Sequence, residues 1–326
     1  MLGGVGEVVE LPYGNGHCAD SEAPGARLML QRVAVLGEVL WDVFPSGARI
    51  GGAAFNFSVQ SRRLGECPLL VTAVGEDELG QRTLGAMDDF GLDTRMVKEL
   101  PGVATGTVTV ELNPDGQPRY TLHRPAPWDS IGLSEVDLAN LAAFQPSWIY
   151  FGTLQNLYET SRNSNLRALE AVPRATRVYD LNLRKDSFTP ELVHELLTRS
   201  DIVKLNDDEI AWVSDTFGID SGRMEDFARR LCDRYGCHTV IMTLGDRGAA
   251  LVSDGEYTRA KGYRVKVADT VGAGDSFTAA VVHGLAQGWP TLRILDFANR
   301  LGACVASRPG GTPAWELSEL ERMERE

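Results

Sequence analysis

The segment DTVGAGDSF at residues 269–277 combines residue types that suit the transfer of a phosphoryl group. Gly272 and Gly274 let the backbone turn sharply and expose its amide groups. Residues 263–267 predict a strand before this turn, and residues 276–285 predict a helix after it. Because amides at a helix start stabilise negative charge together with the helix dipole, the segment is a candidate anion site. No lysine follows the second glycine, which excludes a P-loop here.

Asp275 places an acidic side chain inside this turn, where it would repel a phosphate that was only being bound. A base that takes the proton from an attacking hydroxyl explains the carboxylate. The amides of Gly272, Ala273 and Gly274 would then neutralise charge on the transferred phosphoryl group. The structural alternative is a glycine-rich helix start with Asp275 near its N-cap.

The composition excludes several classes of protein. The chain has 326 residues, 43% of them hydrophobic and 24% charged, which is typical of one large globular domain or two ordinary ones. Its net charge of −13 argues against a general attraction to nucleic acid or anionic lipid. The five cysteines form no CxxC pair and indicate reduced thiols. With no basic signal at the N-terminus and no long apolar run, we expect a cytoplasmic protein without a membrane partner.

The pattern along the chain predicts an α/β domain. Residues 1–28 lack periodicity and predict a poorly ordered extension, which leaves residues 29–326 as the domain. The apolar run at residues 32–40 predicts one buried strand that delivers Asp42 to its end. Further short apolar runs alternate with helix-length segments, as in βαβ units, at residues 148–151, 177–181, 202–205 and 239–244.

A second, smaller β-rich part is predicted by strict alternation of apolar and polar residues. Residues 105–112 and 119–123 alternate in this way, and the sequence NPDG at residues 113–116 supplies a turn between them. Together with residues 41–52, the hairpin at about 104–124 could act as a lid on the larger body.

Two signatures in this chain resemble those of the ribokinase/PfkB sugar kinase family. The segment DTVGAGDSF resembles the C-terminal signature, with GAGD intact. The segments GGAAFNFSVQSRRLG (51–65) and TAVGEDELG (72–80) resemble the N-terminal signature and its continuation. The similarity runs from about residue 29 to 315. It implies a ribokinase-like three-layer sandwich, with a mostly parallel sheet, helices on both faces and a small β-sheet lid.

The resemblance places the sugar on Asp42, Gly51, Gly52 and Asn56. A carboxylate can accept protons from two sugar hydroxyls, glycines allow close approach of the backbone, and an amide both donates and accepts. A tight turn at the two glycines and a helix cap at Asn56 are the structural alternatives.

Asn206 and Glu209 match the family's NxxE element, which the resemblance associates with magnesium and phosphate. Oxygen ligands suit Mg²⁺, and the resemblance assigns Glu209 to the metal, partly through water, and Asn206 to the nucleotide. The same spacing predicts a capping box at a helix start, and both roles can hold together.

The segment DLNLR resembles the DPNLR stretch of fructokinase-like members, with Leu181 where proline is usual. Asn182 is thereby assigned to the substrate. Arg184 would hold a forked cation near the transferred phosphoryl group or an acidic sugar substituent. A plain surface salt bridge is the alternative for Arg184.

The nucleotide positions of the family fall on Thr243, Gly245, Gly248 and Asn299, which implies ATP as phosphoryl donor. Glycines at strand ends and a solvated asparagine are ordinary alternatives. Asp269 opens the signature where many relatives bind a monovalent cation such as K⁺. If Asp269 instead caps its turn, no ion is needed.

The segment HRPAPWD resembles the exit from the lid in fructokinase-like proteins and assigns Arg124 and Trp128 to the sugar. Packing of Trp128 beneath the lid is an equal alternative. The function implied is Mg²⁺-dependent transfer from ATP to a primary hydroxyl of a monosaccharide, with fructose first. The alternatives are 2-keto-3-deoxygluconate, then ribose or a nucleoside, and a non-catalytic sugar or nucleotide sensor. By analogy, a homodimer could form through the lid.

Overall fold

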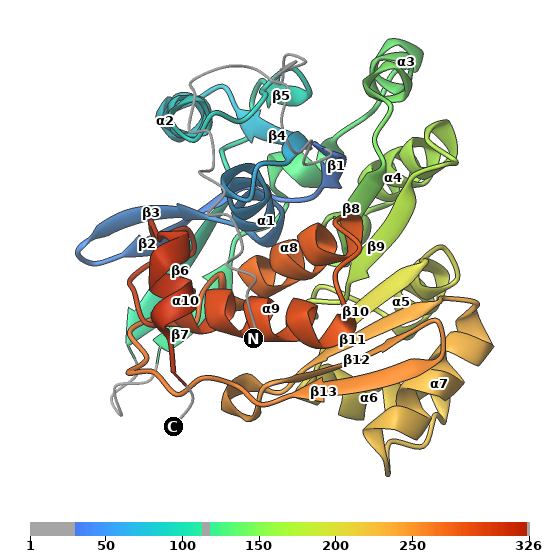
Figure 1. The fold of residues 1–326 in the computed structure, drawn as a ribbon. Coiled ribbons are helices and arrows are strands. Elements are labelled where there is room, and N and C mark those ends of the chain that lie inside the picture. Colours follow the sequence, from blue (N-terminus) through green and yellow to red (C-terminus); the bar gives the residue numbers. More distant parts are fainter. Residues whose placement is uncertain (1–29, 113–117, 325–326) are drawn as a thin grey trace, which may run out of the picture.

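Two sheets organise the computed structural model, which describes residues 30–112 and 118–324 (Figure 1). The strands of the larger sheet are β1 (Arg32–Leu36), β4 (Cys67–Gly75), β5 (Val97–Leu100), β8 (Trp148–Gly152), β9 (Thr176–Asp180), β10 (Ile202–Asn206), β11 (Thr239–Thr243), β12 (Ala249–Ser253) and β13 (Glu256–Ala260). Their order is β13-β12-β11-β10-β9-β8-β1-β4-β5. Neighbours from β5 to β11 pair in parallel, whereas β12 and β13 are antiparallel additions at one edge.

Helices cover both faces of this sheet, as predicted (Figure 1). One face carries α1 (Ala53–Arg63), α2 (Glu78–Asp89), α8 (Ala273–Ala286), α9 (Thr291–Ala306) and α10 (Leu317–Arg322). The other carries α3 (Glu135–Phe144), α4 (Glu159–Ala171), α5 (Pro190–Leu197), α6 (Asp207–Phe217) and α7 (Met224–Tyr235). The three-layer α/β sandwich predicted from the sequence is therefore confirmed.

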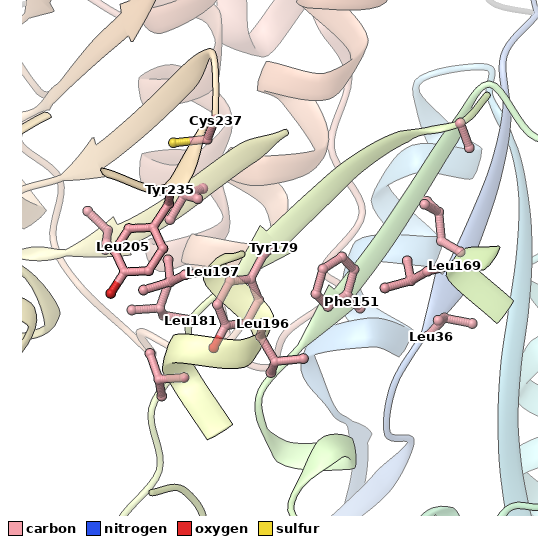
Figure 2. Packing of buried hydrophobic residues seen from close by; sticks show 14 of the residues in the cluster. Leu36, Phe151, Leu169, Tyr179, Leu181, Leu196, Leu197, Leu205, Tyr235 and Cys237 are labelled. Carbon is pink, nitrogen blue, oxygen red and sulfur yellow. The ribbon is translucent and has the colours of Figure 1, made fainter. Parts of the chain in front are cut away.

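The core follows from strands that are apolar on both sides. Every residue of β4 is buried, as expected for a parallel strand that is covered on both faces. On the face of α3 to α7, the rings of Phe151 and Tyr179 stack with centroids 5.3 Å apart, and Leu36 of β1 lies in the same cluster (Figure 2). This packing fixes the carboxyl ends of the parallel strands, which is the edge where such sheets bind ligands.

The smaller sheet has the order β3-β2-β6-β7, and we call it the lid sheet. Its strands are β2 (Leu40–Phe44), β3 (Gly47–Gly51), β6 (Thr107–Leu112) and β7 (Pro118–Leu122). The predicted hairpin is the antiparallel pair β6 and β7, and β2 pairs with β6 in parallel. The predicted turn at 113–116 lies outside the described residues, as does the predicted extension at 1–28.

Two strand predictions are wrong. Residues 32–40 do not form one strand, because the chain leaves the large sheet after Leu36 and enters the lid sheet at Leu40. Gly37 lies in this break against α1, where an added Cβ would come within 2.3 Å of the Ala54 Cβ. Residues 263–267 form no strand, since the sheet already ends with β13 as its edge strand. The amides of Ala268 and Asp269 instead bond to the Ala306 carbonyl at the end of α9.

The cysteines correct another expectation. Cys232, Cys237 and Cys304 are free thiols, but Cys67 is disulfide-bonded, so the prediction of reduced cysteines is wrong for Cys67. None of the helices in the described part of the chain is long and apolar enough to cross a membrane.

Candidate active site

The start of α8 forms the predicted turn. Its N-cap, Gly272, has φ 76°, and an added Cβ there would come within 2.3 Å of the Gly311 carbonyl oxygen. Only glycine fits such a left-handed position against a neighbouring backbone. The Ala273 amide bonds to the Thr270 carbonyl oxygen at 3.4 Å, and the Ser276 amide bonds to the Gly272 carbonyl oxygen at 2.9 Å. Helix geometry leaves the amides of Gly274 and Asp275, between them, without acceptors inside the helix. The turn can therefore direct its free N–H groups at an anion.

Asp275 lies in the first turn of α8 and is half-buried. Its Oδ2 accepts a hydrogen bond of 2.8 Å from the Nδ2 of Asn56 in α1. Burial raises the pKa of Asp275 to about 6, and the Asp180 carboxylate acts in the same direction. The Asn56 hydrogen bond, Lys204 and Arg184 oppose this rise. A carboxylate with a pKa near neutrality is suited to exchange a proton with a hydroxyl.

The side chain of Asn56 contacts Asp275 and does not cap a helix. Its side chain is buried, and its Oδ1 has no hydrogen-bond partner within the described part of the chain. A Cβ added to Gly311 would lie 2.7 Å from this amide, so Gly311 leaves room for Asn56 to reach α8. The two sequence signatures thus meet directly through Asn56 and Asp275.

Asp42 lies in β2, on the lid sheet, and not at the end of the first strand. Burial raises its pKa to about 6, with Asp269 contributing, while Arg184 and Arg49 lower it. A Cβ on Gly51 would come within 3.1 Å of the Asp42 Oδ2. Gly52 precedes α1 with φ 106°, where a Cβ would come within 2.6 Å of the Glu38 carbonyl oxygen. Both glycines therefore allow a close approach of backbone segments.

Arg184 follows β9 and is exposed. It lies in electrostatic range of Asp42, Glu38 and Asp275, which come from three different segments. Among the ion pairs of residues 30–112 and 118–324, none involves Arg184. Its guanidinium therefore adds positive charge near these carboxylates, and no surface salt bridge of Arg184 occurs among the described residues. Asn182, two residues earlier, adopts φ 40°, which turns the chain between β9 and Arg184.

Asn206 and Glu209 form the capping box that the spacing predicts at the start of α6. The Glu209 carboxylate is buried and accepts bonds of 2.8 Å from the backbone amides of both Asn206 and Leu183. It therefore ties the segment bearing Arg184 to α6. Among the described residues, no group of three or more Asp, Glu, His or Cys side chains could hold a metal ion.

The predicted nucleotide residues gather at one corner of the sheet. Thr243 ends β11, Gly245 and Gly248 flank the next turn, and a hollow beside that turn is lined by Asp246, Arg247, Lys261, Gly262 and Arg264. Asn299 of α9 donates a 3.3 Å hydrogen bond to the Lys261 carbonyl oxygen. Asn299 is thus tied to the wall of this hollow and is not a solvated surface residue.

Asp269 caps its own turn. Its Oδ1 accepts from the Val271 amide at 3.0 Å, and its Oδ2 accepts from the Gly310 amide at 3.1 Å. Arg49 of the lid strand β3 lies 3.8 Å from the same carboxylate. These partners favour the capping alternative, in which Asp269 needs no monovalent cation.

Arg124 and Trp128 pack beneath the lid. Arg124 forms an ion pair with Asp129 and donates a 3.0 Å bond to the Leu154 carbonyl oxygen. Trp128 has no exposed surface and joins Val108 in the core of the lid sheet. Trp128 is thus packed beneath the lid, as in the alternative given for it, and the Arg124 guanidinium is held by Asp129 and Leu154. The Nη1 of Arg124 and the Nε1 of Trp128 are buried without a hydrogen-bond partner among the described residues.

Three charged residues of the site were missed by the sequence analysis: Glu38, Lys204 and Asp180. Glu38 is buried, accepts from the Ala53 amide at 2.8 Å, and has a pKa that burial raises to about 7. Lys204 and Asp180 form a buried ion pair below α8. The signal was available, because a charged residue within an apolar strand run is rarely buried without a partner.

The helix start, the carboxylate beside it and the α/β body with its small sheet define the class of ribokinase-like proteins. A family model described as pfkB family carbohydrate kinase matches residues 37–317, and the chain belongs to this family. This chain is 30% identical over 268 residues to the fructokinase of Klebsiella pneumoniae, and the alignment covers 78% of this chain and 84% of that protein.

Solved structures agree on the fold. The structure of 2-dehydro-3-deoxygluconokinase from Thermotoga maritima matches with a TM-score of 0.81 and 20% identity, over 90% of this chain and 98% of that one. A fructokinase from Vibrio cholerae O395, bound to fructose, ADP and calcium, matches with a TM-score of 0.75 and 22% identity, over 90% of this chain and 99% of that one.

Proposed function

We propose that this carbohydrate kinase transfers the γ-phosphoryl group of ATP to a primary hydroxyl of a monosaccharide, with fructose preferred. The observation that carries the proposal is the contact between Asn56 and Asp275, which holds a carboxylate of raised pKa beside the free amides of α8. A base and an anion-stabilising turn at the same place are what phosphoryl transfer to an alcohol requires.

Each step of the reaction has a residue suited to it. Asp275 takes the proton of the attacking hydroxyl, while the amides from Gly272 to Asp275 and the Arg184 guanidinium stabilise charge on the transferred group. Asp42 accepts hydrogen bonds from the sugar. Because Asp42 lies on the lid sheet, sugar binding would draw the lid toward the body and exclude water from the reaction.

The nucleotide would lie along Asn206, Thr243, Gly245 and Gly248, with Asn299 fixing the wall of its site. Mg²⁺ fits the oxygen-bearing start of α6, since each oxygen of Glu209 keeps a lone pair beyond its one backbone hydrogen bond, enough to hold a metal through water. When bound, Mg²⁺ would neutralise charge on the phosphates.

A neutral sugar suits the charges better than a keto-acid. The sugar end carries the Asp42 carboxylate, and Arg124 is already paired with Asp129. A substrate carboxylate, as in 2-keto-3-deoxygluconate, would meet the charge of Asp42 and would have only Arg184 and Arg49 near it, of which Arg49 already lies 3.8 Å from the Asp269 carboxylate. The fructokinase name of the K. pneumoniae relative agrees with this preference, whereas the T. maritima neighbour bears the name of the keto-acid kinase.

A coupled assay of ADP release over a panel of sugars tests the proposal. With ATP and Mg²⁺, we expect the highest kcat/KM for fructose and lower values for 2-keto-3-deoxygluconate, ribose and nucleosides. A preference for the keto-acid would replace fructose. ADP release that no sugar stimulates would favour the sensor alternative, which the intact GAGD segment argues against because a sensor needs no base.

A further inference from the structure

A buried ion pair lies directly below the first turn of α8. The Nζ of Lys204 in β10 is 3.0 Å from the Oδ1 of Asp180 in β9, and both side chains are almost completely buried. The two residues are cross-strand partners in the parallel register of β9 and β10. The Thr278 hydroxyl of α8 lies 3.2 Å from the other oxygen of Asp180 and 2.9 Å from the Gly274 carbonyl oxygen, and its one proton is shared between these two acceptors. The pair is thus attached to the helix whose start forms the anion site.

The ammonium group also approaches the glycine turn itself. A Cβ added to Gly274 would lie 3.5 Å from the Nζ of Lys204, with no other atom closer. The start of a helix is the positive end of its dipole, so it disfavours a cation for stability alone. A buried charge also costs free energy even when it is paired. Helix stability therefore does not explain a lysine at this position.

We propose that Lys204 is a positioning residue for phosphoryl transfer: its buried ammonium adds positive charge directly behind the amides of the α8 turn that carries Asp275. This inference rests on the proposed function of Asp275 as the base. Lys204 is buried beneath the turn, and it acts through the turn above it and through Asp180, whose second oxygen lies 3.2 Å from the Thr278 hydroxyl of the same helix.

The charges around Lys204 support this role. Burial alone would lower its pKa, but the carboxylates of Asp180, Glu209 and Asp275 raise the pKa above its usual value, so Lys204 remains protonated. The titratable and charged groups that face Asp275 from the surrounding segments are Asp180, Lys204, Arg184, Glu38 and Tyr150. Within this set, Lys204 lowers the pKa of Asp275 and Asp180 raises it.

The opposite signs of Lys204 and Asp180 allow a sharp test. The variants are K204M, D180N and K204M/D180N, with K266M as the control because Lys266 is an exposed lysine. Circular dichroism and fructose binding establish that each variant is folded. The readouts are the acidic limb of the kcat/KM profile and, independently of activity, the pKa of Asp275 from ¹³C carboxyl NMR assigned with D275N.

We expect K204M to move the acidic limb and the Asp275 pKa upward by about one pH unit, and D180N to move them downward by a similar amount. The double variant should return both close to wild type, and K266M should change neither. In addition, kcat of K204M should fall about tenfold, because charge behind the anion site is lost.

Shifts of the same sign in K204M and D180N, or no shift in either, would overturn the proposal, since a purely structural role has no reason to reverse sign. If K204M does not fold, D180N and the double variant K204M/D180N decide. A lower Asp275 pKa in D180N that returns to the wild-type value in the double variant supports the role. A lower Asp275 pKa that remains in the double variant refutes it. If the wild type phosphorylates no sugar, the proposed function fails, while the NMR pKa values still decide the coupling.

Discussion

The two glycines of the α8 turn should respond very differently to alanine. Gly272 has φ 76°, and an added Cβ would lie 2.3 Å from the Gly311 carbonyl oxygen. Gly274 lies inside the first helical turn, and its nearest neighbour, the Lys204 Nζ, would be 3.5 Å from an added Cβ. The first substitution meets fixed backbone, whereas the second meets the end of a side chain at ordinary contact distance.

The magnitude follows from these distances. In Gly272→Ala the turn and the Gly311 segment must separate by about 1 Å, and a misplacement of this size can lower turnover about 100-fold. The left-handed conformation costs a further ~1–2 kcal/mol in the free energy of unfolding. In Gly274→Ala we expect kcat/KM within about threefold of wild type, because nothing must move and alanine favours the helix.

Steady-state kinetics of both variants with the preferred sugar, together with urea unfolding, checks this prediction. The sugar KM should change little in either variant, because the turn serves the phosphoryl group. Equal losses of kcat in the two variants, or a Gly272→Ala enzyme with wild-type turnover, would refute the claim that the backbone position of this turn controls the reaction.

Three further predictions concern protons and metal. In the wild type, kcat/KM should rise through about pH 6 as Asp275 and Asp42, whose pKa values both lie near 6, lose their protons. In Asn56→Ala the part of the rise that belongs to Asp275 should shift upward by about one pH unit, since a charge-assisted hydrogen bond is lost, and an entirely unshifted limb would count against the contact. Burial raises the pKa of Glu38 from 4.5 to about 7, so the folded state holds this proton more tightly than the unfolded state, and the free energy of unfolding falls as the pH rises from 4.5 through 7. Glu38→Gln should therefore raise the Tm at pH 8 but not at pH 4.5. Equal changes in Tm at both pH values would contradict the raised pKa of Glu38. Chelation of Mg²⁺ by EDTA should abolish turnover without changing the Tm, and activity that persists in EDTA would exclude a metal role near Glu209.

Much of the fold was predictable because its signals are local. Apolar runs separated by helix-length segments indicated the parallel sheet, and strict alternation with a turn sequence indicated the β6–β7 hairpin. The break between Leu36 and Leu40 was not predictable, because the residues on both sides are equally apolar. Gly37 packs closely against Ala54 of α1 at this break, a contact that local sequence signals do not reveal.

The residues of the candidate site were predictable where they lie in a sequence motif. Their contacts were not predictable where they depend on the packing of distant segments. Asp275 and Asn56 were both singled out, but their direct contact depends on how α1 and α8 pack together. The pairing of Arg124 with Asp129 and the burial of Trp128 could not be read from spacing, because they depend on the segment below the lid. Lys204 lies within an apolar strand run, and its ion pair with Asp180 could not be predicted because it depends on the pairing of β9 with β10.

Turnover of Asp275→Asn, measured by ³¹P NMR of the sugar phosphate with sugar affinity from calorimetry, tests the central claim most directly. Asparagine keeps the size of the side chain and removes its capacity to accept a proton, so product formation should fall by about 10²- to 10⁴-fold while the sugar still binds with a near wild-type Kd. An Asp275→Asn protein that forms sugar phosphate at close to the wild-type rate would contradict the account.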